Sequence, residues 1–279
     1  MTIMKKILAL TLAVIMAAAM LVGCSSKPAE NSAAPAEAQT ESDLAYITNK
    51  GKMTIGMTIF APMNYYDENN ELIGFEVDFG KAVCEKLGVE PEFVEINWDA
   101  KEVELNAKNI DCIWNGMTIT DERKANMSIS NPYMTNKQVM VAKKDKADAY
   151  KESAAGALVV AEAGSAGEEL ATGDAFFADA DFTAVDSMAK ALMDVASGTS
   201  DIAIVDYVTS IGSIGEGTDY EDLVVVDAAD FSPEEYGIAF RKGSDTTAKV
   251  NEVISELVAD GTLAEIAAKY KLDGVLSAK

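Results

Sequence analysis

The 279-residue sequence contains no histidine, and this absence excludes several common kinds of site. Without an imidazole the chain can form neither a Ser-His-Asp triad nor a Cys-His pair, and it cannot form a zinc site that depends on histidine. Basic residues are also scarce, because 23 Lys and Arg face 46 Asp and Glu and give a formal net charge of −23. Since binding to a phosphate backbone depends on basic side chains, this charge argues against nucleic acid as a partner.

Cysteine is rare too, with three residues in the chain. Cys84 falls in a helical pattern and Cys112 in a strand-like one, which is typical of cysteines that act as small core residues. A disulfide between them remains an alternative in an exported protein. No set of metal ligands is apparent, because the acidic turn 67–71 is similar to a calcium loop but has Leu72 where that loop requires glycine. We therefore expect no bound metal.

The amino-terminal segment has the pattern of an export signal. Lys5 and Lys6 precede an apolar run, residues 7–22, after which Gly-Cys follows at Cys24. This ending resembles the lipobox of bacterial lipoproteins, in which the signal, here residues 1–23, is removed and the cysteine carries the lipid. A transmembrane helix is the alternative, but the run is short for a span of about 20 residues.

Behind the cysteine, residues 24–43 form a polar stretch that predicts a flexible tether, because it has too little apolar surface to offset the entropy of ordering. Strand and helix patterns then alternate. Apolar residues recur every four positions over 76–87 before a glycine, which predicts a helix. The apolar run 202–205 predicts a buried strand, and two closing helices are predicted over 246–260 and 262–270. This alternation predicts an α/β architecture with largely parallel sheets.

A polar segment, residues 116–123, follows the strand predicted over 110–114, and open α/β sheets place their ligand sites at such strand ends. Thr118 offers a hydroxyl and a backbone N–H. Arg123 offers a planar guanidinium that suits a carboxylate. The same residues can instead form a helix N-cap followed by a solvated arginine, and the spacing leaves both interpretations open.

Four segments together carry a resemblance to a known family. They are residues 73–79, 116–123, 236–244 and 259–266, which read IGFEVDF, GMTITDER, YGIAFRKGS and ADGTLAEI. Their order and separations resemble those of the bacterial family 3 solute-binding proteins, the extracytoplasmic receptors of polar amino acid ABC transporters. The resemblance extends from residue 51 to about residue 270.

The resemblance implies an α/β, two-lobed, periplasmic-binding-protein-like fold of type II, with two crossing segments at the hinge. The crossings would lie near 131–137 and 229–234. Lobe one would then comprise residues 44–132 plus 233–279, and lobe two would comprise residues 133–232. Family members close these lobes over one amino acid.

In lobe one, Phe60 and Trp98 correspond to the family's aromatic wall, although both could be ordinary core aromatics. Thr58 stands where several members carry an aspartate, so that contact is in doubt. Met63 replaces a common aromatic and would make the wall more adaptable. Met117, within the polar segment, is a further candidate.

The polar ligand contacts implied for lobe one come from residues 115–123. Asn115 and Gly116 would offer carbonyls to the ligand ammonium, and Thr118 would offer its N–H and hydroxyl. Arg123 would bind the α-carboxylate. A zwitterion needs partners at both ends when water leaves, because burying an unpaired charge is costly.

Lobe two would supply the complementary contacts. Ser165 and Ala166, at a glycine-rich entry to a helix, match positions that touch the α-carboxylate, where free N–H groups favour an anion. Asp206, after the strand 202–205, matches the acid that pairs with the α-ammonium, although a helix N-cap or a surface aspartate is the alternative. Glu162 stands where other members have Lys or Gln, and it could attract a cationic side chain, accept from an amide, or face water.

The resemblance therefore implies a receptor that binds a polar L-amino acid, uncharged or cationic rather than acidic, and presents it to the permease subunits of an ABC transporter. We expect a lipid-anchored monomer on the extracytoplasmic side of the cell membrane. It needs no cofactor, because closure over a ligand breaks no bond. Two alternatives remain: an enzyme similar to the cyclohexadienyl dehydratases, with Glu162 as the acid–base candidate, or an amino acid sensor for a membrane signalling partner.

Overall fold

The computed structural model describes residues 42–228 and 231–278. The predicted signal over 1–23, the lipidation candidate Cys24 and all but the end of the predicted tether lie outside the described residues. Two residues of the second predicted crossing, 229 and 230, lie outside them as well. Within the described ranges, none of the helices combines the length and the apolar character needed to span a membrane.

The first lobe is built on a five-stranded sheet of order β4-β1-β5-β13-β6. Its strands are β1 (Lys52–Met57), β4 (Glu90–Glu95), β5 (Cys112–Ile113), β6 (Met127–Ile129) and β13 (Ala239–Arg241). A short hairpin of β2 (Tyr65–Tyr66) and β3 (Leu72–Ile73) stands apart from this sheet. The helices of this part of the chain are α1 (Asp43–Lys50), α2 (Phe75–Leu87), α3 (Lys101–Asn106), α4 (Asp121–Asn126), α8 (Thr246–Ala259) and α9 (Thr262–Lys269), with a 3₁₀ turn η1 (Trp98–Ala100).

Helix α2 shows why the sequence folds this way locally. Phe79 and Val83 lie one turn apart on its inner face and are fully buried. The helix ends at Gly88, whose φ of 71° allows its N–H to reach the last carbonyls, as glycine does at many helix ends. The closing helices α8 and α9 pack against α2 and so return the carboxyl end of the chain to the first lobe. The sequence predictions for these three helices are confirmed to within one residue at each end.

The second lobe contains a sheet of order β11-β7-β10-β8-β9, with β12 also paired to β7. Its strands are β7 (Met134–Lys143), β8 (Leu158–Glu162), β9 (Asp181–Val185), β10 (Ile202–Asp206), β11 (Leu223–Val225) and β12 (Pro233–Tyr236). The helices are α5 (Ala166–Gly173), α6 (Met188–Ser197) and α7 (Tyr207–Ser213), with 3₁₀ turns η2 (Ala147–Tyr150) and η3 (Ala175–Phe177).

The prediction of largely parallel sheets is correct only for part of each sheet, namely β4-β1-β5 and β10-β8-β9. In the first sheet β13 runs antiparallel to both of its neighbours, and in the second β7 runs antiparallel to β10, β11 and β12. A parallel connection needs a crossover, usually through a helix. Strands β7 and β13 instead follow extended segments that pass between the sheets. The local pattern of apolar residues does not show whether such a strand runs parallel or antiparallel to its neighbours.

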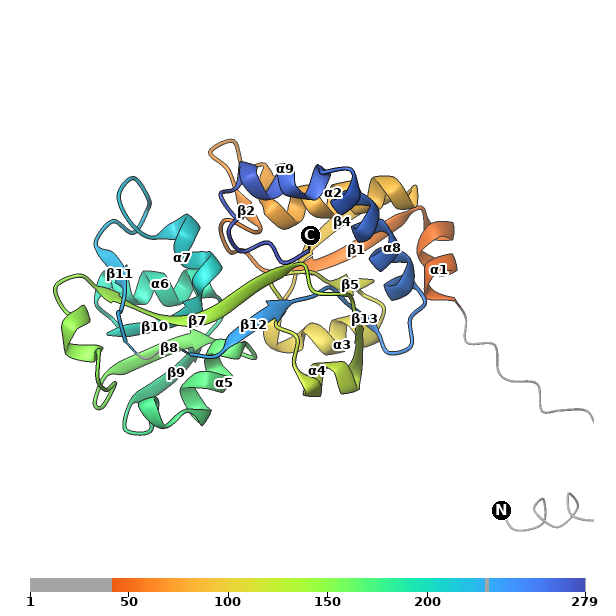
Figure 1. The fold of residues 1–279 in the computed structure, drawn as a ribbon. Helices are drawn as coiled ribbons and strands as arrows, with labels where there is room; N and C mark the ends of the chain where they lie inside the picture. The colour runs from red at the N-terminus through yellow and green to blue at the C-terminus, as the bar shows by residue number, and fades with distance from the viewer. Residues whose placement is uncertain (1–41, 229–230, 279) are drawn as a thin grey trace, which may run out of the picture. The chain divides into compact units, whose positions relative to one another are not determined.

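Two paired strands connect the lobes (Figure 1). Strands β7 and β12 run antiparallel, with Met134 opposite Tyr236 and Lys137 opposite Pro233. Beside them, Tyr133 is fully buried, and its ring centre lies 5.6 Å from that of Phe79 in an edge-on arrangement. The hinge ribbon is therefore anchored in the aromatic core of the first lobe.

Cys84 and Cys112 are both unbonded and fully buried. Burial raises the pKa of the Cys84 thiol to about 12 and that of Cys112 well above its ordinary value. Thiols with such raised pKa values are poor nucleophiles, because the thiolate is the reactive form. The prediction that these residues fill small spaces in the core is confirmed.

Candidate functional site

The loop after β5 is held closely against the loop after β1. Thr58 donates from its N–H and its hydroxyl to Asn115 Oδ1, at 2.9 and 2.7 Å, and the Asn115 amide donates back to the Thr58 carbonyl at 2.9 Å. Gly116 has a φ of 53°, and a Cβ there would lie 2.7 Å from the Phe60 ring. The Gly116 N–H donates to the buried Glu76 carboxylate at 2.7 Å. Glycine is required here by both its backbone angle and the close aromatic packing.

Trp98 lies in η1 and is 5% exposed, with the Lys101 ammonium 4.8 Å from its ring centre. Lys101 Nζ donates to the Trp98 carbonyl at 3.2 Å and to the Gly164 carbonyl of the second lobe at 2.9 Å. Burial and, to a smaller extent, the nearby Arg123 charge lower the pKa of Lys101 to about 8. Lys101 therefore lies over the Trp98 ring and joins the two lobes directly.

Arg123 is 5% exposed although it carries a charge. Its Nη1 donates to the Thr118 carbonyl at 2.8 Å, and its Nη2 lies 3.2 Å from Glu169 Oε1 in the second lobe. The N-cap interpretation is correct for the backbone, because the Thr120 hydroxyl accepts from the Arg123 N–H at 3.1 Å. The solvated side chain that accompanied this interpretation is wrong, because the guanidinium lies between the lobes.

The entry to α5 faces the same region from the second lobe. Ser165 is the N-cap, and its hydroxyl accepts from the Glu168 N–H at 3.2 Å. Ala166 is the first residue of the helix. The Gly164 N–H donates to the Glu168 carboxylate at 2.6 Å. The chain's own acids thus already interact with part of this helix entry.

Asp206 closes β10 and is 2% exposed, so the alternative of a surface aspartate is wrong. Its Oδ1 accepts from the side-chain amides of Asn136 at 2.9 Å and Gln138 at 2.5 Å. The same two amides donate to Glu234 Oε1 at 2.5 and 2.7 Å. Burial and, to a smaller extent, the Glu234 carboxylate raise the pKa of Asp206 to about 7. Burial also raises the pKa of Glu234.

Glu162, at the end of β8, is 2% exposed, and no hydrogen-bond donor reaches its Oε1 within the described part of the chain. Burial raises its pKa to about 8, and the Asp206 carboxylate acts in the same direction. Lys101 and the Thr58 hydroxyl, both from the first lobe, oppose this rise. Glu162 therefore faces the other lobe and does not face water.

Met63 and Met117 are fully buried in the hydrophobic core. Met117 packs in a small cluster that includes Leu105 and Ile113. Its backbone carbonyl accepts from the Gly237 N–H at 3.0 Å. Both methionine side chains thus contact core residues behind the loops that carry the polar candidates.

A cavity of about 640 Å³ lies between the lobes, lined by Thr118 and Thr120 on one side and by Ala166 and Glu169 on the other. The hinge residues Gln138 and Glu234 also line it, so it adjoins partners of both Arg123 and Asp206.

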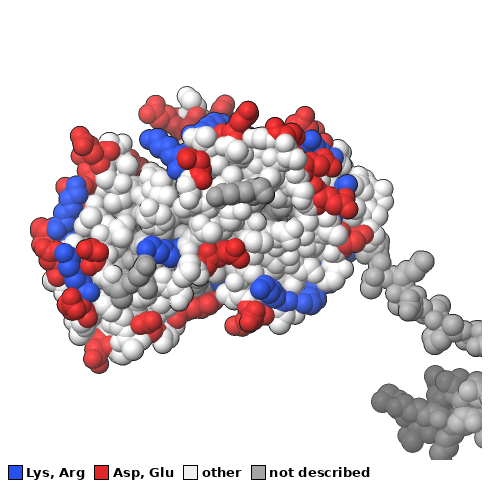
Figure 2. Space-filling model, in the orientation of Figure 1, with Lys and Arg blue, Asp and Glu red and all other residues white. Residues whose placement is uncertain are grey.

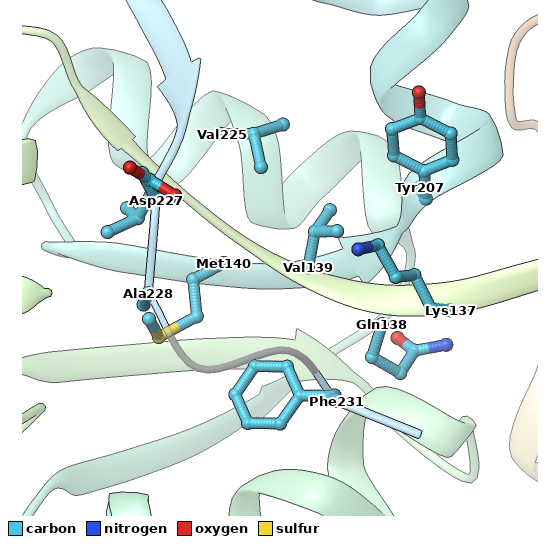
Figure 3. Close-up of a pocket in the computed structure, with 10 residues that line it drawn as sticks. Lys137, Gln138, Val139, Met140, Tyr207, Val225, Asp227, Ala228 and Phe231 are labelled. Carbon is cyan, nitrogen blue, oxygen red and sulfur yellow. The ribbon is translucent and has the colours of Figure 1, made fainter. Parts of the chain in front are cut away.

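A second cavity, of about 540 Å³, lies beside β7 (Figure 3). In the close-up, Lys137, Gln138 and Val139 follow the strand, with Tyr207 beyond them and Phe231 on the opposite side. None of the residues that line it is a predicted site residue.

The described charged side chains on the face drawn in Figure 2 form no extended basic region of the kind that nucleic acid binding requires. On the face drawn in Figure 2, acidic side chains are widely spread, and basic ones lie in small separate groups among them. This agrees with the excess of acid in the sequence and with the argument against a phosphate backbone as partner.

The match to a known family covers most of the chain. The family model for bacterial extracellular solute-binding proteins, family 3, matches residues 53–273. The chain belongs to this family. Its resemblance in segment order and spacing is thereby confirmed, and the family's description as extracellular agrees with an extracytoplasmic location.

Comparison with known proteins shows what the chain is similar to. It is 29% identical over 227 residues to the arginine-binding extracellular protein ArtP of Bacillus subtilis (strain 168), covering 80% of this chain and 87% of that one. It is 28% identical over 260 residues to the L-cystine-binding protein TcyJ of Escherichia coli (strain K12), covering 92% of each. A crystal structure of the ancestral amino acid-binding protein AncCDT-1, a precursor of cyclohexadienyl dehydratase, matches with a TM-score of 0.71 at 30% identity, covering 82% of this chain and 99% of that one. Relatives of this family 3 chain are thus amino-acid-binding proteins.

The sequence analysis did not identify five residues of this region as site residues: Lys101, Asn136, Gln138, Glu169 and Glu234. A signal for two of them was present. Asn136 and Gln138 are two residues apart in β7, which places both side chains on one face of the strand. Both are nearly fully buried, as polar residues that interrupt a core strand often are when they carry hydrogen bonds.

Proposed function

We propose that the chain is the substrate-binding component of an ABC transporter, which binds a polar L-amino acid between its lobes and delivers it to the permease. Lobe one would comprise residues 44–132 plus 233–279 and lobe two residues 133–232, closing about β7 and β12 as a monomer. The arginine- and cystine-binding relatives support a polar amino acid ligand.

One observation carries the proposal. Arg123 and Asp206 are both nearly fully buried, come from different lobes and have partners that line one cavity between the lobes. A guanidinium suits an α-carboxylate, and an aspartate suits an α-ammonium. A zwitterion bound between them would have both of its charges paired when water leaves, which is the condition for favourable burial.

The proposed contacts follow the two ends of the ligand. Arg123 would release the exposed Glu169 carboxylate and take the ligand carboxylate in its place, together with Thr118. Asp206 would take the ammonium. The other proposed contacts are Phe60, Trp98, Asn115, Gly116, Ser165 and Ala166, with Thr58 and Glu162 near the ligand side chain.

Isothermal titration of the purified protein with a panel of L-amino acids tests this proposal. We expect saturable binding of at least one polar member. Arg123→Ala or Asp206→Asn should weaken it by about 30-fold or more, because truncating one partner of a buried charge pair costs about 2–5 kcal/mol.

Lys124→Ala is the matched control, because this side chain lies on the same helix as Arg123 but is 58% exposed. It should bind like the wild type. Absence of binding across the whole panel would contradict the proposal, as would full affinity in both cleft variants.

We also propose that Cys24 carries a lipid that holds the protein on the outer side of the cell membrane. The support is the sequence pattern at residues 7–24 and the extracellular family. Mass spectrometry of the protein from the membrane fraction should show an acylated amino-terminal cysteine, and Cys24→Ala should move the protein to the soluble fraction. An uncleaved, unacylated amino terminus would contradict the anchor.

A dehydratase activity is the second candidate, and Glu162 is the observation that favours it. A buried carboxyl with a pKa raised to about 8 remains protonated at neutral pH and has the character of a general acid. Incubation with arogenate or prephenate and measurement of the aromatic product tests this candidate. Absence of product above background excludes it.

A further inference from the structure

The region between the lobes holds more carboxyl groups than basic side chains. Three buried or largely buried carboxyl groups meet there: Glu162, Asp206 and Glu234. Asp206 raises the pKa of Glu162 through its charge, and Glu234 raises the pKa of Asp206 in the same way. Across residues 42–228 and 231–278, none of the three forms an ion pair with a lysine or arginine within 4 Å.

The two cations of this region are engaged elsewhere. Lys101 directs its ammonium at two backbone carbonyls, those of Trp98 and Gly164. Arg123 directs its guanidinium at the Thr118 carbonyl and at Glu169. They act on the acids only through space, as Lys101 does on Glu162 and Arg123 does on Glu234.

Glu162 differs from the other two acids in having an unpaired oxygen. Asp206 and Glu234 both accept hydrogen bonds from the amides of Asn136 and Gln138. Glu162 Oε1 is buried and accepts none within the described residues. Buried polar atoms are rarely left without a partner, so such an atom points to a group that the protein alone does not supply.

The position of this oxygen is set by both lobes. Glu162 ends β8 in the second lobe, and its neighbours Thr58 and Lys101 come from the first. The Thr58 hydroxyl donates to Asn115 at 2.7 Å and lies close enough to Glu162 to lower its pKa, but no donor within the described residues reaches Glu162 Oε1. A group that satisfies Glu162 must therefore bring its own protons into the space between the lobes.

Charge balance indicates what that group is. A zwitterionic ligand adds one positive and one negative charge, so it leaves the excess of acid unchanged. A ligand with a cationic side chain adds one further positive charge and supplies N–H donors. Burial of a charge is favourable only when it is paired, and this applies to the carboxylate and to the ligand cation alike.

We infer that the protein selects L-amino acids with a cationic side chain, and that the unpaired oxygen of Glu162 is the acceptor for that cation. This rests on the proposed function, because it assigns the side-chain subsite of the same cleft. Asp206 is left for the α-ammonium, so the two carboxylates bind the two positive charges of one ligand.

L-Arginine and L-citrulline provide the test, because they have nearly the same shape and differ in side-chain charge. Isothermal titration of the full-length protein at neutral pH should give arginine an affinity about 10- to 100-fold higher than citrulline, the range expected for one charge-assisted hydrogen-bonded contact. In Glu162→Gln this ratio should fall below about 3-fold, mainly through weaker arginine binding.

Glu235→Gln is the matched control. It lies on β12 next to Glu234, is exposed, and removes the same charge from the protein, so it should keep the wild-type ratio. If the Glu162 variant does not fold, the ratio of arginine to citrulline affinity in the wild type alone tests the inference.

Two results would overturn the inference while leaving amino acid binding intact. One is a wild-type protein that binds citrulline or another neutral L-amino acid as well as it binds arginine. The other is a Glu162→Gln variant that folds and keeps the full arginine preference. Failure to bind any amino acid would overturn both this inference and the proposed function.

Discussion

Replacing Glu76 by glutamine should change how the stability of the protein depends on pH. Glu76 is 1% exposed and accepts from the Gly116 N–H at 2.7 Å, from the Asn64 amide at 2.5 Å and from the Tyr133 hydroxyl. These three bonds favour the ionised form, but burial outweighs them and raises the pKa to about 7 from an ordinary 4.5. Ionised Glu76 therefore opposes folding.

The magnitude follows from that pKa difference. At 1.36 kcal/mol for each pKa unit, raising the Glu76 pKa from 4.5 to about 7 corresponds to about 3 kcal/mol. Between these values the folded chain holds a proton that the unfolded chain has released, so this group makes stability fall as pH rises. Glutamine has no such proton. The variant should therefore gain about 3 kcal/mol relative to the wild type between about pH 4 and pH 8.

Urea denaturation of both proteins across this pH range measures the effect as a difference, which removes the contributions of the other titrating groups. Asn64 Oδ1 has no partner in the described structure, so a flip of this amide lets it accept from the new glutamine. Any hydrogen bond lost on substitution adds an offset that does not vary with pH. Glu71→Gln, in an exposed turn, controls for the change in net charge. A wild-type-to-variant difference that stays constant from pH 4 to pH 8 would refute the reasoning.

Three further changes follow from close contacts in the cleft. Gly116→Ala should lower the free energy of unfolding by about 1–3 kcal/mol in urea titrations, because a Cβ there would lie 2.7 Å from the Phe60 ring; an unchanged midpoint would contradict this. Gly212→Ala should weaken ligand binding about 5- to 100-fold, since its Cβ would lie 2.8 Å from Pro62 of the facing lobe; calorimetry with full affinity would show that the lobes do not approach there. Lys101→Met should reduce affinity about 2- to 10-fold by removing the hydrogen bond to the other lobe while keeping the stem on the aromatic ring; tighter binding would reverse the assigned role.

The sequence predicted the fold correctly where a helix or strand is defined by a local pattern of residues. Helix α2 has buried residues at one-turn spacing and a terminal glycine, and both features are local. The direction of β7 and β13 was not predictable from such patterns, because an apolar strand looks alike in parallel and antiparallel sheets. Strand direction depends on where the chain comes from, which is a property of the whole topology.

The residues of the candidate site also differ in how far the sequence predicted them. The pattern around Arg123 allowed two interpretations, and the structure combines them, with an N-cap in the backbone and a buried guanidinium. Lys101 escaped prediction because a lysine in an acidic helix normally faces water. Its burial depends on Trp98 beside it and on Gly164 from a distant segment. Interactions between segments 41 or 63 residues apart leave no periodic trace in the sequence.

The contact between Arg123 and Glu169 has a consequence for how the affinity of such a receptor is tuned. The carboxylate of a ligand must compete with the carboxylate of Glu169 for Arg123. Because Glu169 is exposed, this ion pair contributes no more than about 1 kcal/mol. Natural variation or deliberate design at this one solvent-facing residue offers a graded way to adjust uptake sensitivity to nutrient supply, because it leaves the groups proposed to recognise the cargo untouched.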